Sequence, residues 1–131
     1  MSDVPYGKDL AVYKLARAKE ELDTASLLAD NEKWKAANNR AYYAIYYAIT
    51  AVLCLEPIAF HKHKDTLAYF NKNYVHTEIF GRTFGRRIAR AEKIRHASDY
   101  DDFYIASKEE TMEQIETAKL LIKEVENYIQ R

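Results

Sequence analysis

One arginine falls on the apolar face of a helix, with a carboxylate and a phenol about one turn further along. In the segment IRHASDYDDF, Arg95 is followed by Asp99 and Tyr100. A guanidinium keeps its charge at any ordinary pH and is costly to bury without partners. Two interpretations of Arg95 follow. It could line a cleft and bind a phosphate through two parallel hydrogen bonds, or it could pair with Asp99 while its aliphatic stem covers apolar surface.

The segment NNRAYYAIYYAIT, residues 38–50, predicts a helix with two different aromatic faces. At about 100° per residue, Tyr42 and Tyr46 share one face, and Tyr43 and Tyr47 share another with Arg40. A tyrosine ring can be buried while its hydroxyl keeps a hydrogen bond. We expect the first face to fill the core. We expect the second face to meet the helix of Arg95 or a second copy of the chain.

A basic stripe precedes Arg95 on the same helix. Its members recur at helical spacing on one face, opposite the apolar Phe84 and Ile88, and are Arg82, Arg86, Arg90 and Lys93. Such a stripe could follow an RNA backbone, or it could be only a solvated surface. Phe80 and Phe84 lie near it and could stack on bases, although the core is the expected place for both.

Other chemistry has little support in the sequence. His61 and His63, in HKHK, would supply at best half of a metal site, because no carboxylate or cysteine stands beside them at the usual spacing. Glycine-rich phosphate loops and the nucleophile-elbow motif are missing. Cys54, among apolar neighbours, is typical of a buried small hydrophobe. We therefore expect no metal and no cofactor.

The composition favours one compact helical domain over the 131 residues, 1–131. Hydrophobic residues make up 48% and charged residues 31%, with three glycines and two prolines. Lys plus Arg and Asp plus Glu both number 20, so no global field draws the chain to nucleic acid or anionic lipid. No apolar run reaches the roughly 18 residues of a membrane span. A single cysteine without a signal-like segment indicates a cytoplasmic protein.

Hydrophobic periodicity of 3.6 residues predicts five helices, which must position these side chains. They cover about residues 8–29, 33–55, 64–76 and 83–98, and a last helix begins at the capping-box pair Ser107 and Glu110. Short connections favour an all-α, antiparallel up-and-down bundle. The second helix is apolar nearly all round, so we expect it to be central.

Three blocks in this order and spacing resemble the small stand-alone members of the HEPN superfamily (higher eukaryotes and prokaryotes nucleotide-binding). The blocks are NNRAYYAIYYAITAVL, KHKDTLAYFNKNYV and IRHASDYDDF, within about residues 34–103. The resemblance implies a helical bundle that forms a two-fold homodimer. It also implies a ribonuclease toxin, or a protein paired with a minimal nucleotidyltransferase that acts as its antitoxin. His63 and Lys64 match a recurring feature at the start of the third helix, which favours a structural role for them.

Active HEPN ribonucleases carry an arginine followed, after four to six residues, by a histidine. By position the arginine is Arg95, but positions 100 to 102 hold Tyr100, Asp101 and Asp102. His96 points about 100° away from Arg95 along the helix. The phenol of Tyr100, with an ordinary pKa of about 10, is a weak base near neutral pH.

The resemblance therefore implies a nucleotide- or RNA-binding pocket in which catalysis is degenerate, with Arg95 and Tyr100 as the remaining catalytic candidates. In this pocket Arg95 would bind phosphate, Asp99 would orient it, and Tyr100 would lie at the rim. The facing helix would add Asn39, Arg40, Tyr43 and Tyr47. Asn39 and Arg40 could instead only cap the open end of the bundle.

Three functions remain open at this point. The first is an RNA- or nucleotide-interacting component of a toxin–antitoxin-like pair. The second is a dimeric adaptor without enzymatic activity, whose ligand is a nucleotidyltransferase protein. The third is an active ribonuclease.

Overall fold

Five α-helices and one π-helical turn build the fold across residues 4–131, the part of the chain that the computed structural model describes. They are α1 (Lys8–Asp30), α2 (Trp34–Leu53), α3 (His63–Phe70), the π-helical turn η1 (Asn71–Val75), α4 (Thr83–Tyr100) and α5 (Lys108–Ile129). No strand occurs within residues 4–131. The all-α helical bundle expected from periodicity is confirmed.

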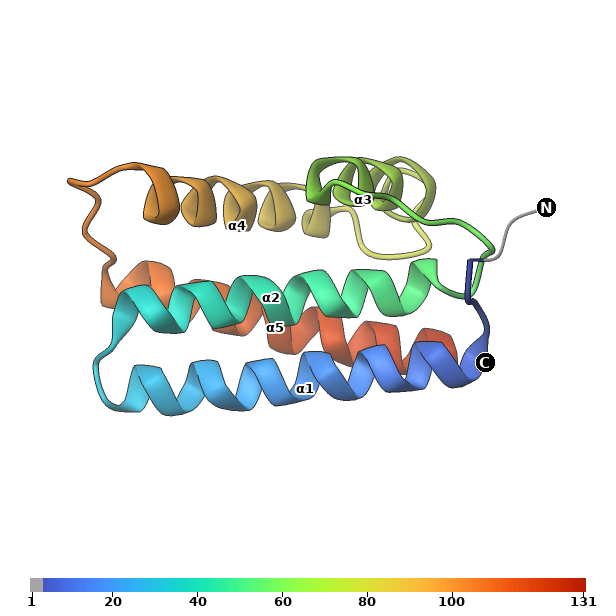
Figure 1. The fold of residues 1–131 in the computed structure, drawn as a ribbon, viewed down its shortest axis with the longest axis horizontal. Helices are drawn as coiled ribbons and strands as arrows, with labels where there is room; N and C mark the ends of the chain where they lie inside the picture. The colour runs from blue at the N-terminus through green and yellow to red at the C-terminus, as the bar shows by residue number, and fades with distance from the viewer. Residues whose placement is uncertain (1–3) are drawn as a thin grey trace.

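The helices form two layers, and α2, which belongs to the first layer, also contacts the helices of the second (Figure 1). α1, α2 and α5 lie side by side in one layer, while α3, η1 and α4 follow one another along the other. α2 packs against α1, α3, α4 and α5. The C-terminal end of α4 and the start of α2 therefore lie at the same end of the bundle, together with the connection between α1 and α2.

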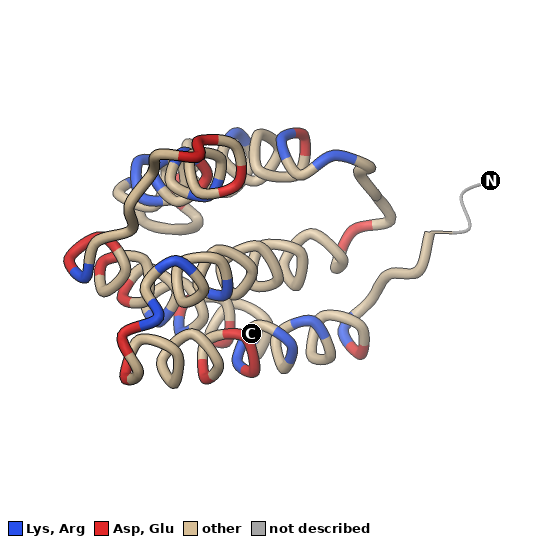
Figure 2. Tube along the Cα trace, turned by 60° about the vertical axis from the view of Figure 1, so that its left-hand side comes forward, with Lys and Arg blue, Asp and Glu red and all other residues tan. Residues whose placement is uncertain are grey.

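α2 takes the central place because it carries almost no charge. From Ala41 to Leu53 it has no Lys, Arg, Asp or Glu, whereas charged positions are spread over the other helices (Figure 2). Ile45, Ile49 and Val52 are completely or almost completely buried. Burying one such side chain stabilises the fold by about 1.5–3 kcal/mol. The expected central position of the second helix is confirmed.

α4 presents one apolar and one basic face, as its sequence predicts. Phe84, Ile88 and Ala91 are buried, and the four members of the basic stripe are exposed. The helix continues to Tyr100, two residues beyond the predicted end. Asp99 and Tyr100 therefore belong to the same helix as Arg95.

Two helix predictions differ from the structure. α2 ends at Leu53 rather than near residue 55, since the chain turns at Glu56, whose N–H donates to the Leu53 carbonyl at 3.0 Å, just before Pro57. The third helix is regular only to Phe70 and then widens into η1, closed by the N–H of His76 donating to the Asn71 carbonyl at 2.9 Å. Periodicity does not resolve such a change, because η1 spans only five residues, too few to establish a different spacing.

Candidate functional site

Arg95 lies in the last part of α4 with its guanidinium turned toward α2. Its side chain is 26% exposed, and its Cζ lies 5.2 Å from the centre of the Tyr42 ring. Asp99, one helical turn further on, places Oδ2 at 3.1 Å from Arg95 Nε. The arginine is thus held inward by a ring on one helix and a carboxylate on its own.

The Arg95–Asp99 contact is an ion pair and not an aligned hydrogen bond. Nε of Arg95 is buried and has no hydrogen-bond acceptor within the described residues, although Asp99 lies within ion-pair distance. Burial acts against the charged form, but the nearby phenols of Tyr43 and Tyr42 and the Asp99 carboxylate leave the pKa of Arg95 raised. Arg95 is therefore a permanent positive charge that its surroundings only partly satisfy.

His63, at the first residue of α3, completes an aromatic wall beside Arg95. Its ring stacks on Tyr46 at 3.9 Å between centres, and its Nδ1 lies 3.2 Å from the Tyr42 hydroxyl. Burial, and then the charge of Arg95, lower the pKa of His63. Burial raises the pKa of Tyr42, so this phenol stays protonated and can donate to Nδ1. With Nδ1 accepting, the neutral ring carries its proton on Nε2.

A cavity of about 630 Å³ opens at the end of the bundle, between the start of α2 and the end of α4. It brings together three of the residues predicted from sequence, Asn39, Arg40 and Asp99. Trp34 also lines it, and sequence reasoning missed this residue. Two signals were available in the sequence. Trp34 stands about one helical turn before NNR, and an indole offers a flat face on which a base can stack.

Arg40 is already engaged within the bundle. Its Nη1 lies 2.9 Å from Oε2 of Glu21 on α1, and its Nη2 donates to the Asn39 side chain at 2.9 Å. Its guanidinium also lies over the Tyr43 ring at 5.3 Å. These contacts fit the second interpretation, in which Asn39 and Arg40 cap the open end of the bundle. The same contacts hold the Arg40 side chain in place in the wall of the cavity.

A second cavity, of about 680 Å³, lies on the other side of Arg95. Its walls include Lys64, Glu92, Lys93, Arg95, His96 and Asp101. Asp99 borders the first cavity and Arg95 borders the second, so their ion pair joins a residue of one cavity to a residue of the other.

Two predicted pocket residues lie elsewhere. Tyr47 faces α1, where Arg17 donates to its hydroxyl at 3.2 Å and lies over its ring at 4.8 Å. The expectation that Tyr47 meets the Arg95 helix within the chain is wrong, because α1 covers that face of α2. Tyr42, expected to fill the core, contacts Arg95, and Tyr43 of the predicted face also lies near Arg95. Tyr100 is 72% exposed, and its ring centre lies 4.8 Å from that of His96.

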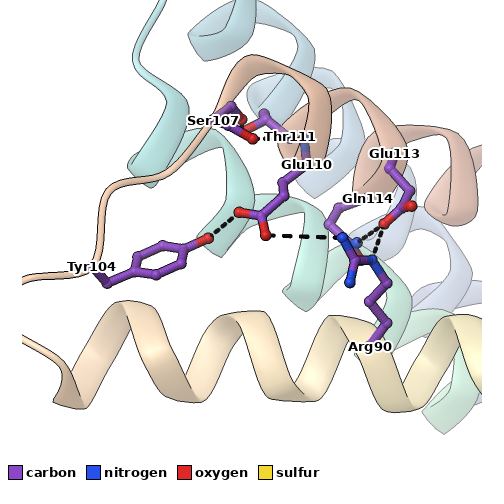
Figure 3. A network of polar contacts seen from close by, with 7 residues as sticks. All are labelled: Arg90, Tyr104, Ser107, Glu110, Thr111, Glu113 and Gln114. Carbon is purple, nitrogen blue, oxygen red and sulfur yellow. Dashed lines mark hydrogen bonds and ion pairs between the residues drawn. The ribbon is translucent and has the colours of Figure 1, made fainter.

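The basic stripe is partly neutralised by carboxylates. Arg82 pairs with Glu78 at 3.5 Å, and Arg90 is bound by Glu113 and lies 3.9 Å from Glu110. Figure 3 shows Arg90 reaching from α4 to α5, where Glu110 also accepts a hydrogen bond from Tyr104 at 2.5 Å. Arg86 and Lys93 have no carboxylate within ion-pair distance among the described residues.

Two further features concern sites that the sequence analysis weighed. Over residues 4–131, no three side chains of His, Cys, Asp or Glu gather closely enough to hold a metal ion. In that same part of the chain, no helix has both the length and the hydropathy that crossing a bilayer requires.

The comparison with known families decides what kind of bundle this is. A family model described as HEPN domain matches residues 11–128, from the first turn of α1 to the end of α5. The chain belongs to the HEPN family. Both cavities and Arg95 fall inside the matched HEPN region.

Relatives of this HEPN protein come from bacteria and archaea. A Thermotoga maritima protein named "UPF0332 protein" is 33% identical over 118 residues, which cover 90% of this chain and 89% of the relative. Two Methanocaldococcus jannaschii proteins are named "Putative toxin MJ0605" and "Putative toxin MJ0142". They are 28% and 24% identical and cover 87% and 88% of this chain and 79% and 78% of their own lengths. The chain is thus a HEPN domain protein similar to proteins named as toxins.

Proposed function

We propose that this HEPN domain binds RNA or a nucleotide at Arg95, as one component of a toxin–antitoxin-like pair whose other member is a minimal nucleotidyltransferase. The observation that carries the proposal is the position of Arg95. Its charge is permanent, three quarters of its side chain is covered, it borders one cavity, and its ion-pair partner Asp99 borders another. A phosphate accepts the hydrogen bonds that such a guanidinium has to offer.

The surrounding side chains suit the remainder of a nucleotide. Trp34 supplies a stacking surface in the first cavity, and Lys64 and Lys93 add positive charge to the second. Cleavage is not part of the leading proposal, because no histidine stands at positions 100 to 102. His63 approaches the arginine instead, but its Nδ1 is bonded to Tyr42.

The test is equilibrium binding of ATP and of a short single-stranded RNA. Trp34 is the sole tryptophan of the chain, so its fluorescence reports ligand in the first cavity directly. Arg95→Gln should weaken binding by about tenfold or more, the loss of a charge-assisted hydrogen bond. Arg17→Gln is the matched control, because Arg17 also lies over a tyrosine ring but belongs to α1 and lines neither cavity. Equal affinity of wild type and Arg95→Gln contradicts the proposal.

The adaptor without enzymatic activity is the second candidate, and the connection between α4 and α5 favours it. Phe103 is 92% exposed and Ile105 is 86% exposed. Both belong to the connection between α4 and α5, which lies at one end of the bundle (Figure 1). When a partner covers exposed apolar side chains of this size, their removal from water favours binding. We assign this surface to a second copy of the chain, in a homodimer, with the nucleotidyltransferase as the alternative partner.

Two outcomes separate the candidates. If neither ATP nor RNA binds wild type at micromolar concentration, the adaptor is the function that remains. Ribonuclease activity, the third candidate, requires that wild type cleave RNA faster than Arg95→Ala does. Equal background cleavage by both proteins removes it.

A further inference from the structure

A third cavity, separate from Arg95, lies between the first half of α4 and the middle of α5. Its volume is about 330 Å³, and it is lined by Thr83, Arg86, Arg87, Arg90, Glu113, Gln114 and Thr117. Three arginines thus face a single glutamate. We propose that this cavity binds a phosphate group.

The charge of the cavity is not balanced from within the protein. Glu113 is bound by Arg90 and accepts a hydrogen bond from the Gln114 side chain at 3.2 Å, so its carboxylate is committed to one side of the cavity (Figure 3). No carboxylate lies within ion-pair distance of Arg86 or Arg87 among the described residues. Two guanidinium charges therefore remain for a ligand.

One of these two guanidiniums is already held in place. Nη1 of Arg87 donates to the hydroxyl of Thr117 at 2.9 Å, and Thr117 is almost completely buried on α5. Arg87 itself is half-buried. A guanidinium has five N–H donors in a rigid fork, so a single bond to Thr117 fixes its direction and leaves the others for a ligand. Less side-chain entropy is then lost when an anion binds.

The chemistry of the walls favours phosphate over a carboxylate. A carboxylate carries one charge and would leave one of the two arginines uncompensated, whereas a phosphate dianion balances both and accepts two parallel bonds from each fork. Thr83 lies in the first turn of α4, where the helix dipole also favours negative charge.

The phosphate could come from a small molecule or from a nucleic-acid backbone. Arg86 also borders a neighbouring cavity of about 510 Å³, together with Asn71, His76 and Arg82. A polymer with evenly spaced phosphates could occupy both cavities, while inorganic phosphate or a mononucleotide would occupy only the first. Inorganic or terminal phosphate could balance Arg86 and Arg87 alone, whereas each phosphodiester of a backbone carries one charge and would bring successive phosphates to the arginines.

The test titrates the full chain with inorganic phosphate, with sulfate and with chloride at equal ionic strength, by calorimetry. Phosphate and sulfate should bind and chloride should not. Arg86→Gln should weaken phosphate binding by about tenfold, the loss of one charge-assisted contact. Arg87→Gln should have a similar effect, and Arg86→Gln keeps the test valid if Arg87→Gln fails to fold, because Arg86 is exposed and unpaired. Arg17→Gln, on α1, is the control and should change affinity less than twofold.

A second arm identifies the source and uses a short RNA with the Arg95→Gln protein. If Arg86→Gln weakens RNA binding in that background and free phosphate does not saturate the protein, the ligand is a polynucleotide backbone. Saturation by free phosphate assigns a small molecule. Phosphate that binds no better than chloride, together with RNA affinity that Arg86→Gln and Arg87→Gln leave unchanged, overturns the site. Arg95→Gln itself should leave phosphate binding intact, which separates this site from the one at Arg95.

Discussion

At the scale of single residues, Tyr42 connects the two groups that distinguish this site. Its ring lies beside the Arg95 guanidinium, and its hydroxyl bonds to His63. The inward direction of Arg95 was predictable, because its position on the apolar face and its spacing from Asp99 are local properties of one helix. The approach of His63 was not, since α2 and α3 meet through packing that periodicity does not specify.

His63 should make the stability of the protein depend on pH. The pKa of His63 is lowered in the folded chain, by burial and then by Arg95, while Glu92 acts in the opposite direction. Below the ordinary histidine pKa of about 6.5 the unfolded chain takes up a proton first. The contribution of His63 to the free energy of unfolding should therefore be fully present above that value. It should decrease as the pH falls from that value toward the folded-state pKa. Urea denaturation about one pH unit above and about one below 6.5 measures the difference.

His63→Gln should reduce that difference, because the side chain no longer titrates. His61→Gln, two residues earlier and exposed, is the control and should keep the pH dependence of wild type. A His63→Gln protein whose stability changes with pH as much as that of wild type would contradict this account.

At the scale of elements, the helix ends show where local sequence is sufficient and where it is not. The capping-box pair correctly predicted the start of α5, and the hydroxyl of Ser107 accepts the N–H of Glu110 at 3.0 Å. The Glu110 side chain does not complete the box. It binds Tyr104 and approaches Arg90 instead, since folding brings a phenol and a guanidinium within its reach.

Loss of the cap at α5 should be measurable. Ser107→Ala removes the acceptor of the Glu110 N–H and should lower the free energy of unfolding by about 0.5–2 kcal/mol. Ser107→Asp keeps an acceptor at the same position and should restore most of the loss. Thermal or urea unfolding of the three proteins checks this, and equal stability of Ser107→Ala and wild type would show that the cap contributes nothing.

The connection from α1 to α2 contains a strained residue. Glu32 has φ of 58°, in the left-handed region, while the N–H groups of Glu32 and Lys33 donate to the carbonyls of Ala29 and Leu28. This is the helix end at which glycine is preferred. Glu32→Gly should therefore raise the free energy of unfolding by about 0.5–1 kcal/mol.

The matched control for Glu32→Gly is Asp30→Gly. Asp30 is exposed and is the last residue of α1, so glycine there should destabilise the protein. Denaturation midpoints of both variants beside wild type give the comparison. A loss of stability in Glu32→Gly would show that its backbone is not under strain.

At the scale of the whole molecule, the Trp34 cavity and the exposed apolar surface lie at one end of the bundle, whereas the proposed phosphate cavity lies along the first half of α4. The cavity with Trp34 and the exposed Phe103 and Ile105 all lie near the end of α4. The overall bundle followed from periodicity and from the family resemblance. The first cavity brings together Asn39, Arg40 and Asp99 of the predicted pocket, but the other cavities were not predicted, because their walls combine residues of elements that are distant in the sequence.

If the tip of the bundle contacts a second copy, apolar-to-polar changes there should release single chains. Phe103→Ser combined with Ile105→Ser removes the two most exposed large apolar side chains outside any helix and should leave the fold unchanged. Sedimentation over a range of concentrations should give a dimer for wild type and a monomer for the double variant. A wild type that sediments as a monomer at every concentration would contradict the homodimer.

The direction in which the helices run also decides how the molecule can be attached to other things. α1 begins, and α5 ends, at the end of the bundle remote from Trp34 and Phe103 (Figure 1). A surface anchor, a dye or a fused domain joined before α1 or after α5 would therefore hold the molecule by its far end. Immobilised in this way on a sensor chip, the protein would present the Arg95 cavities and the apolar tip to the analyte in solution.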